Sequence, residues 1–178
     1  MISYPMKNSS KPGLVLAAFM AVSILMSGCS QESPRGANMV FVQAIGGHSV
    51  GGPYKGKDAQ ILVITTAQSV SGISDWLYSY DADTLSVVDY GRYFGVVAFN
   101  GWRGGLAGDF KITEVWQNKS TVYAQANFDD GALTSVAINS SQYEGILIER
   151  TSYPLTGLIT FKLLDSSGKE RASRIQYL

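Results

Sequence analysis

The residue whose type and position most clearly suggest chemistry is Cys29, the single cysteine of this 178-residue chain. It follows a segment with Lys7 and Lys11 near its start and an apolar run from Leu14 to Met26. About 13 residues reach only about 20 Å as a helix, which is too short to span a bilayer. A basic start, a short apolar run and small residues before a cleavage point are typical of a secretory signal peptide.

The pair Ser27-Gly28 directly before Cys29 resembles the lipobox of bacterial lipoproteins, with Met26 where leucine is commonest. The resemblance implies that the signal peptide, residues 1–28, is removed and that Cys29 is acylated, for example with palmitate. Each buried methylene adds about 0.8 kcal/mol of membrane affinity, so several chains anchor a protein stably. Ser30 differs from the aspartate of an inner-membrane retention signal. We therefore expect a lipid-anchored protein at the outer membrane of a two-membrane envelope, or otherwise on the outer face of the plasma membrane.

His48 is the single histidine and lies in a glycine-rich segment, residues 46–52. A metal site needs further Cys or His ligands, and a serine hydrolase of the α/β type needs a Gly-x-Ser-x-Gly elbow. Neither pattern occurs in the sequence. We interpret His48 as a loop residue that contacts a partner, and we expect no metal and no other cofactor.

A second glycine-rich segment, residues 101–108, contains Trp102 and Arg103. A phosphate-binding loop would be followed by a helix, whereas residues 109–116 alternate between apolar and polar as a strand does. The segment is therefore interpreted as a connection between strands. Its exposed aromatic and cationic side chains would suit contact with a protein partner.

Two acidic segments, Asp81-Ala82-Asp83-Thr84 and Asp129-Asp130-Gly131, lack the spread of oxygen ligands of a calcium loop and are interpreted as turns. No pair of carboxylates is singled out for glycoside hydrolysis, because their separation depends on the fold. An envelope hydrolase with an acid-based site remains an alternative, and Asp129, Asp130 and Glu144 are the acids to test first.

Composition excludes some classes of partner. Without Lys7 and Lys11, the mature part of about 150 residues has 12 basic and 14 acidic side chains, a net charge near −2. It has no basic stripe, so we expect no nucleic acid partner. With Cys29 acylated, the mature domain contains no thiol.

The elements are expected to be mainly short strands. Residues 29–38 form the acylated cysteine and a polar tether, and residues 39–178 form one domain rich in Val, Ile, Tyr, Phe and Thr. One helix is predicted from Ser71 to Tyr80, covering one end of the β structure. The predicted fold is mostly β: a small antiparallel β-sandwich or partly open barrel with one short helix. The predicted strands are 39–45, 60–66, 93–99, 110–116, 121–128, 132–138, 145–150, 158–164 and 171–177.

Residues 41–169 resemble the C-terminal domain family of PrcB, a lipoprotein subunit of a surface protease complex. The resemblance is carried by Phe41–Ser49, by Gln60–Thr66 with Ser74-Asp75-Trp76, by Val88-Asp89-Tyr90 with Val96–Gly101, and by the glycine-rich loop before Phe110–Val115. The family commonly has Thr-Gly-Gly-Tyr before that last strand, where this chain has residues 106–110, Leu-Ala-Gly-Asp-Phe. The resemblance implies a non-catalytic accessory domain that binds or stabilises a protein partner such as a protease, and it supplies no catalytic residue.

These observations predict a lipid-anchored, extracytoplasmic accessory or binding module that is not an enzyme. Its expected contact residues are His48, Trp102 and Arg103. An envelope hydrolase and a direct peptidase inhibitor, which would present loops to a protease cleft, are the alternatives.

Overall fold

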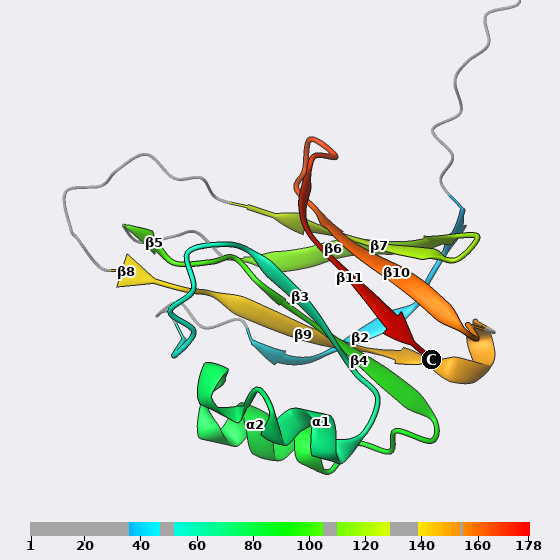
Figure 1. Ribbon diagram of the computed structural model, residues 1–178, viewed down its shortest axis with the longest axis horizontal. Coiled ribbons are helices and arrows are strands. Elements are labelled where there is room, and N and C mark those ends of the chain that lie inside the picture. The colour runs from blue at the N-terminus through cyan, green and yellow to red at the C-terminus, as the bar shows by residue number, and fades with distance from the viewer. Residues whose placement is uncertain (1–35, 47–51, 105–109, 129–138, 154) are drawn as a thin grey trace, which may run out of the picture. The chain divides into compact units, whose positions relative to one another are not determined.

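The chain forms two facing β-sheets and a short helical segment in a computed structural model that describes residues 36–46, 52–104, 110–128, 139–153 and 155–178 (Figure 1). Sheet A has the strand order β1-β6-β7-β10-β11, and sheet B has the order β2-β9-β4-β3. Strands β5 (Arg103–Gly104) and β8 (Asn139–Ser140) form a separate ribbon. Within the sheets, every strand pair is antiparallel except β7 with β10. The predicted mostly β fold is confirmed, with two packed sheets and no closed barrel among the described strands.

Sheet A is built from strands that bury one face only. In β7, for example, Val122, Ala124 and Ala126 are buried and point toward sheet B, while the residues between them are part-exposed. The opposite face, which we call the bare face, carries the stacked pair Trp116 and Tyr123, whose ring centroids are 5.2 Å apart. The strands are β1 (Ala37–Asn38), β6 (Lys111–Asn118), β7 (Thr121–Asn127), β10 (Leu158–Leu164) and β11 (Glu170–Tyr177).

The strands β3, β4 and β9 of sheet B are largely buried on both faces, whereas its edge strand β2 is partly exposed. In β4, Phe94, Val96 and Ala98 pack against sheet A, whereas Val97 and Phe99 pack on the other side, against the helical segment. Strands buried on both sides have continuous apolar sequences, and β3 and β4 show this pattern. The strands are β2 (Phe41–Gly46), β3 (Gln60–Ile64), β4 (Tyr93–Phe99) and β9 (Tyr143–Glu149).

The helical segment covers the outer face of sheet B and consists of α1 (Ala67–Ser71), η1 (Ser74–Trp76) and α2 (Ser79–Ser86) (Figure 1). The prediction of one helix from Ser71 to Tyr80 at one end of the β structure was wrong in extent and position. Two α-helices and a 3₁₀ turn form instead, and their apolar residues lie along the sheet surface. The residues that pack there are Val70, Ile73, Leu77 and Leu85. A further 3₁₀ turn, η2 (Arg150–Ser152), follows β9.

The chain passes from sheet A to sheet B between β1 and β2. Met39 N–H donates to Val115 O (2.8 Å), which extends the pairing of β1 with β6. The Tyr153 hydroxyl accepts from Val40 N–H (2.7 Å) and donates to Asn38 O (3.0 Å), so it ties the crossing from both sides. Ala37 and Asn38 were predicted to belong to the tether, but they pair with Gln117 and Trp116 of β6.

Most predicted strands are present with ends shifted by one or two residues, and those at 93–99 and 158–164 have the predicted bounds. The predicted hairpin of β6 and β7 is confirmed, with Lys119 at φ 53° in its turn. The strand and turn predicted at residues 129–138 lie outside the described residues.

Candidate functional site

The structure gathers several strand ends that lead to the predicted contact residues at one end of the two sheets. Gly46, two residues before His48, is paired with Glu144; Arg103 is paired with Ser140; and Lys111 is paired with Asn127, two residues before Asp129. The Ile112 N–H donates to the Glu144 carboxylate, which joins sheet A to sheet B at this point. We call this region, residues 46, 100–104, 110–112, 127 and 139–144, the loop end (Figure 1).

Of the predicted contact residues, Trp102 is the one whose side chain is described, and of the three acids proposed for a hydrolase, Glu144 is the one described. Trp102 is 41 % exposed. Arg103 lies in β5, where the structure describes its backbone but not its side chain. Cys29, His48, Asp129 and Asp130 lie outside the described residues.

The backbone that carries Trp102 is fixed by its neighbours. Trp102 N–H donates to Gly56 O (2.7 Å), and Asn100 N–H donates to Gln142 O (2.9 Å). Gly101 between them has φ +83°, and a Cβ atom there would lie 2.6 Å from Lys57 O. Because only glycine fits this conformation and this space, Gly101 sets the direction in which Trp102 leaves the sheet.

Beneath the loop end, polar side chains are buried between the sheets. Asn100, Ser141, Gln142 and Glu144 are each at most 4 % exposed. Asn100 Oδ1 and Ser141 Oγ have no hydrogen-bond partner among the described residues. Buried polar atoms without a partner are uncommon in folded proteins and need an explanation. Glu144 was named from the sequence as one acid of the hydrolase alternative, but no motif indicated the burial of Asn100, Ser141 and Gln142.

Glu144 is the acidic residue of the cluster, and it follows Tyr143 in β9 on the face that packs toward sheet A. Burial raises the pKa of its carboxyl group, while the bond from Ile112 N–H and the nearby charge of Lys111 act in the opposite direction. Glu144 is 1 % exposed and bonded to backbone. This geometry suits a link between the sheets better than an acid that must reach a substrate.

A second buried polar group joins α2 to sheet B. The Tyr143 hydroxyl donates to Asp81 Oδ2 (2.5 Å) and accepts from Tyr78 N–H (3.0 Å). Burial, followed by the bond to Asp81, raises the pKa of Tyr143 well above its ordinary value. Residues 81–84 were predicted to form a turn, which was wrong, because Asp81 lies in the first turn of α2 and is only 3 % exposed. Its partner Tyr143 is 62 residues away, so no local pattern indicated the pair.

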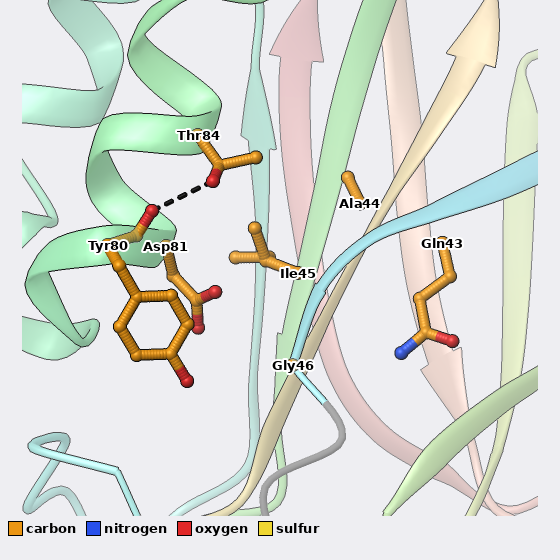
Figure 2. Close-up of a pocket in the computed structure, with 7 residues that line it drawn as sticks. All are labelled: Gln43, Ala44, Ile45, Gly46, Tyr80, Asp81 and Thr84. Carbon is orange, nitrogen blue, oxygen red and sulfur yellow. Dashed lines mark hydrogen bonds between the residues drawn. The ribbon is translucent and has the colours of Figure 1, made fainter.

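A pocket of about 370 Å³ lies beside Asp81, between α2 and β2 (Figure 2). It is lined by Gln43, Ala44, Ile45 and Gly46 from the strand and by Tyr80, Asp81 and Thr84 from the helix. Figure 2 shows Ile45, Tyr80, Asp81 and Thr84 on one side of β2 and Gln43 on its other side.

Among the described residues, no group of three or more His, Cys, Asp or Glu side chains is placed to hold a metal ion. In the same part of the chain, no helix has the length and apolarity needed to span a bilayer. No protein-family model, curated protein or solved structure matches the chain. The resemblance to the PrcB C-terminal domain family therefore stays a prediction.

Proposed function

We propose that this chain is a lipid-anchored accessory module of the cell envelope that binds a protein partner, such as a surface protease, through its loop end. In this proposal Cys29 carries the lipid and Trp102 is the main contact residue. The module contributes binding and not catalysis.

One observation carries the proposal: several strand ends meet at one end of the two packed sheets, with Trp102 exposed on a fixed backbone. Loops held by a rigid β scaffold are a common way to build a binding surface. Tryptophan is enriched among the residues that contribute most to protein interfaces, because it buries a large area with little loss of conformational freedom. The cross-sheet bond of Glu144 supports this surface from below.

The binding proposal is tested by recovery of the partner from solubilised membranes. Trp102→Ala should reduce the amount recovered with the full chain at least about tenfold, since truncation of a central interface residue costs about 2 kcal/mol or more. Its melting temperature should change little, because the side chain is part-exposed. Tyr177→Ala, which removes a 70 % exposed aromatic residue from the bare face, is the matched control. Retention of the partner by Trp102→Ala, with loss by Tyr177→Ala, would contradict the proposal.

The anchor is tested separately. Cys29→Ala should move the protein from the membrane fraction to the soluble fraction without unfolding the β domain. If Cys29→Ala stays on membranes after a high-salt wash, the lipid anchor is refuted, whatever the result for Trp102.

The hydrolase alternative gains little support from Glu144, because this carboxyl group is buried and bonded to backbone. The inhibitor alternative shares the loop end with our proposal. Incubation of the full chain with the recovered protease separates them: an inhibitor lowers peptidase activity in proportion to its concentration, whereas an accessory module leaves it unchanged or raises it.

A further inference from the structure

A second possible contact surface lies away from the loop-borne Trp102, along the outer edge of sheet B. Strand β2 is the terminal strand of this sheet, so none of the described strands pairs with its outer edge. An edge strand presents peptide N–H and C=O groups that an added strand can bond. Val42 of β2 is 63 % exposed, which is unusual for an apolar residue on such an edge.

The C-terminal part of β2 lines the pocket beside α2. A β-bulge between Gln43 and Ile45 inserts Ala44 into the strand, and Ala44 and Ile45 pack toward the helical segment. A bulge bends a strand and limits the length over which another strand can pair with it. An extended segment that paired with β2 as far as the bulge would end beside the pocket, which is lined by residues 43–46 of this strand, instead of continuing as a long sheet.

Aspartate is the only charged residue type in the stretch of chain that contains the helical segment, and Asp81 of this stretch lines the pocket. Residues 58–91 contain aspartates at positions 58, 75, 81, 83 and 89, and no lysine, arginine, histidine or glutamate. Asp81 is the one charged residue among the described residues that line the pocket. It is only 3 % exposed, so it acts on the pocket by its charge across a short distance, and the hydrogen bond from the Tyr143 hydroxyl fixes its position. A cationic side chain is therefore the electrostatic complement of the pocket.

Tyr80 supplies the apolar wall that a long cationic side chain needs. Its ring is 53 % exposed and is stacked on Tyr78, with ring centroids 5.9 Å apart and an angle of 9° between planes. Lysine and arginine pack their methylene stems on such surfaces, and an aromatic face also attracts their charge. The Thr84 hydroxyl donates to Tyr80 O (2.8 Å) one turn earlier in α2, so both residues belong to the helical wall of the pocket, and β2 forms the opposite wall (Figure 2).

We propose that the groove between β2 and α2 binds an extended segment of a partner protein as an added β-strand, with a lysine or arginine side chain in the pocket beside Asp81. Backbone pairing with β2 would supply affinity, and the pocket would select the cationic residue. The inference does not depend on the loop end, and the segment can belong to the same partner or to another.

The probe is a fluorescent, capped eight-residue peptide of alternating threonine and valine with one central lysine, compared with its glutamate and norleucine counterparts. The fluorescence anisotropy of the lysine peptide should rise when the full chain, in detergent, is added. The glutamate peptide should bind at least about tenfold more weakly, and the lysine preference should fall as salt is raised, because solvent ions screen the charge.

The matched variants are Thr84→Arg and Ser86→Arg, which add the same charge to the same exposed helix. Thr84→Arg fills the pocket with a cation and should weaken the lysine peptide at least about tenfold, whereas Ser86→Arg, outside the pocket, should change affinity less than about twofold. Circular dichroism verifies that both variants fold. No binding of the lysine peptide, equal losses in both variants, or β2 pairing with a second copy of the chain instead would each overturn the proposal.

Discussion

The two sheets differ in what lies on their outer faces. Sheet B is covered by the helical segment, so that Leu85 of α2 is 0 % exposed, whereas the bare face of sheet A leaves Ile175 66 % exposed. The charge differs in the same way: residues 58–91 have aspartates as their only charged side chains, while residues 158–178 have four basic and two acidic side chains. Sheet B is thus the sheet whose outer face is covered by the helical segment, in a stretch whose charged residues are all aspartates. Sheet A is packed on its inner face only.

The largest expected difference between the faces concerns core packing. Leu85→Ala should lower the free energy of unfolding by about 3 kcal/mol, because it leaves a cavity between α2 and sheet B. Ile175→Ala on the bare face should change it by less than about 0.5 kcal/mol. Urea unfolding of both variants measures the difference. Similar values for the two would mean that the helices do not pack firmly on sheet B.

The next expected effect concerns the buried bond between the cover and sheet B. Tyr143→Phe should lower the free energy of unfolding by about 2 kcal/mol, because Asp81 loses a donor and Tyr78 N–H loses an acceptor. Tyr177→Phe, which removes a hydroxyl from a residue 70 % exposed, should have almost no effect. Hydrogen exchange of the amides in α2 should quicken in Tyr143→Phe alone; unchanged exchange would show that the bond does not hold the helix.

A smaller effect is expected where the sheets are joined. Burial raises the pKa of Glu144 in the folded chain, so its ionisation destabilises the fold as pH rises through the folded pKa. Glu144→Gln keeps an oxygen acceptor for Ile112 N–H without the charge. It should therefore raise the free energy of unfolding by on the order of 1 kcal/mol at pH 8, and the gain should shrink below pH 4. A loss of stability at pH 8 would show that the bond needs the negative charge.

The smallest expected effect is on the bare face, where Lys162 Nζ and Glu170 Oε2 are 2.7 Å apart and both side chains are part-exposed. Lys162 lowers the pKa of Glu170, so the pair stabilises the fold above the ordinary pKa of glutamate and loses its effect as pH falls through the lowered value. After solvent screening, Glu170→Gln should cost less than about 0.5 kcal/mol at pH 7 and nothing near pH 2. A pH titration of stability, repeated in high salt, tests this.

The difference between the two sheets also explains which elements were predicted correctly from the sequence. The alternation of β6 and β7 and the compact turn at Lys119 are local, so that hairpin was predicted correctly. The continuous apolar runs of β3 and β4 were predicted as strands. They also indicate that both faces of these strands are buried, so that the face away from sheet A must be packed by another element, and this was not inferred. The helical segment was therefore placed at one end and given a single helix.

Most features of the candidate site depend on contacts between residues far apart in the sequence, so sequence patterns did not predict them. Trp102 was expected to be exposed because glycines surround it, and its side chain is 41 % exposed, but the short strand β5 that begins at Arg103 was not predicted. The contact role of both residues stays a prediction. The Asp81–Tyr143 bond and the Glu144–Ile112 bond join residues 62 and 32 positions apart, and neither pair has a local signal. Residue type alone could not show that these two acids are buried, since aspartate and glutamate are usually exposed.

The strand β1 has a mechanical consequence. Ala37 pairs with Gln117, at the opposite end of β6 from Lys111 and therefore about 20 Å from the loop end. A pull on the N-terminal side of the chain is taken first by two residues of β1, by the Met39–Val115 bond and by the hydroxyl of Tyr153. A force applied to the chain before Ala37 would therefore break the contacts of this crossing, including the two hydrogen bonds of Tyr153, before it disturbed the surface that presents Trp102.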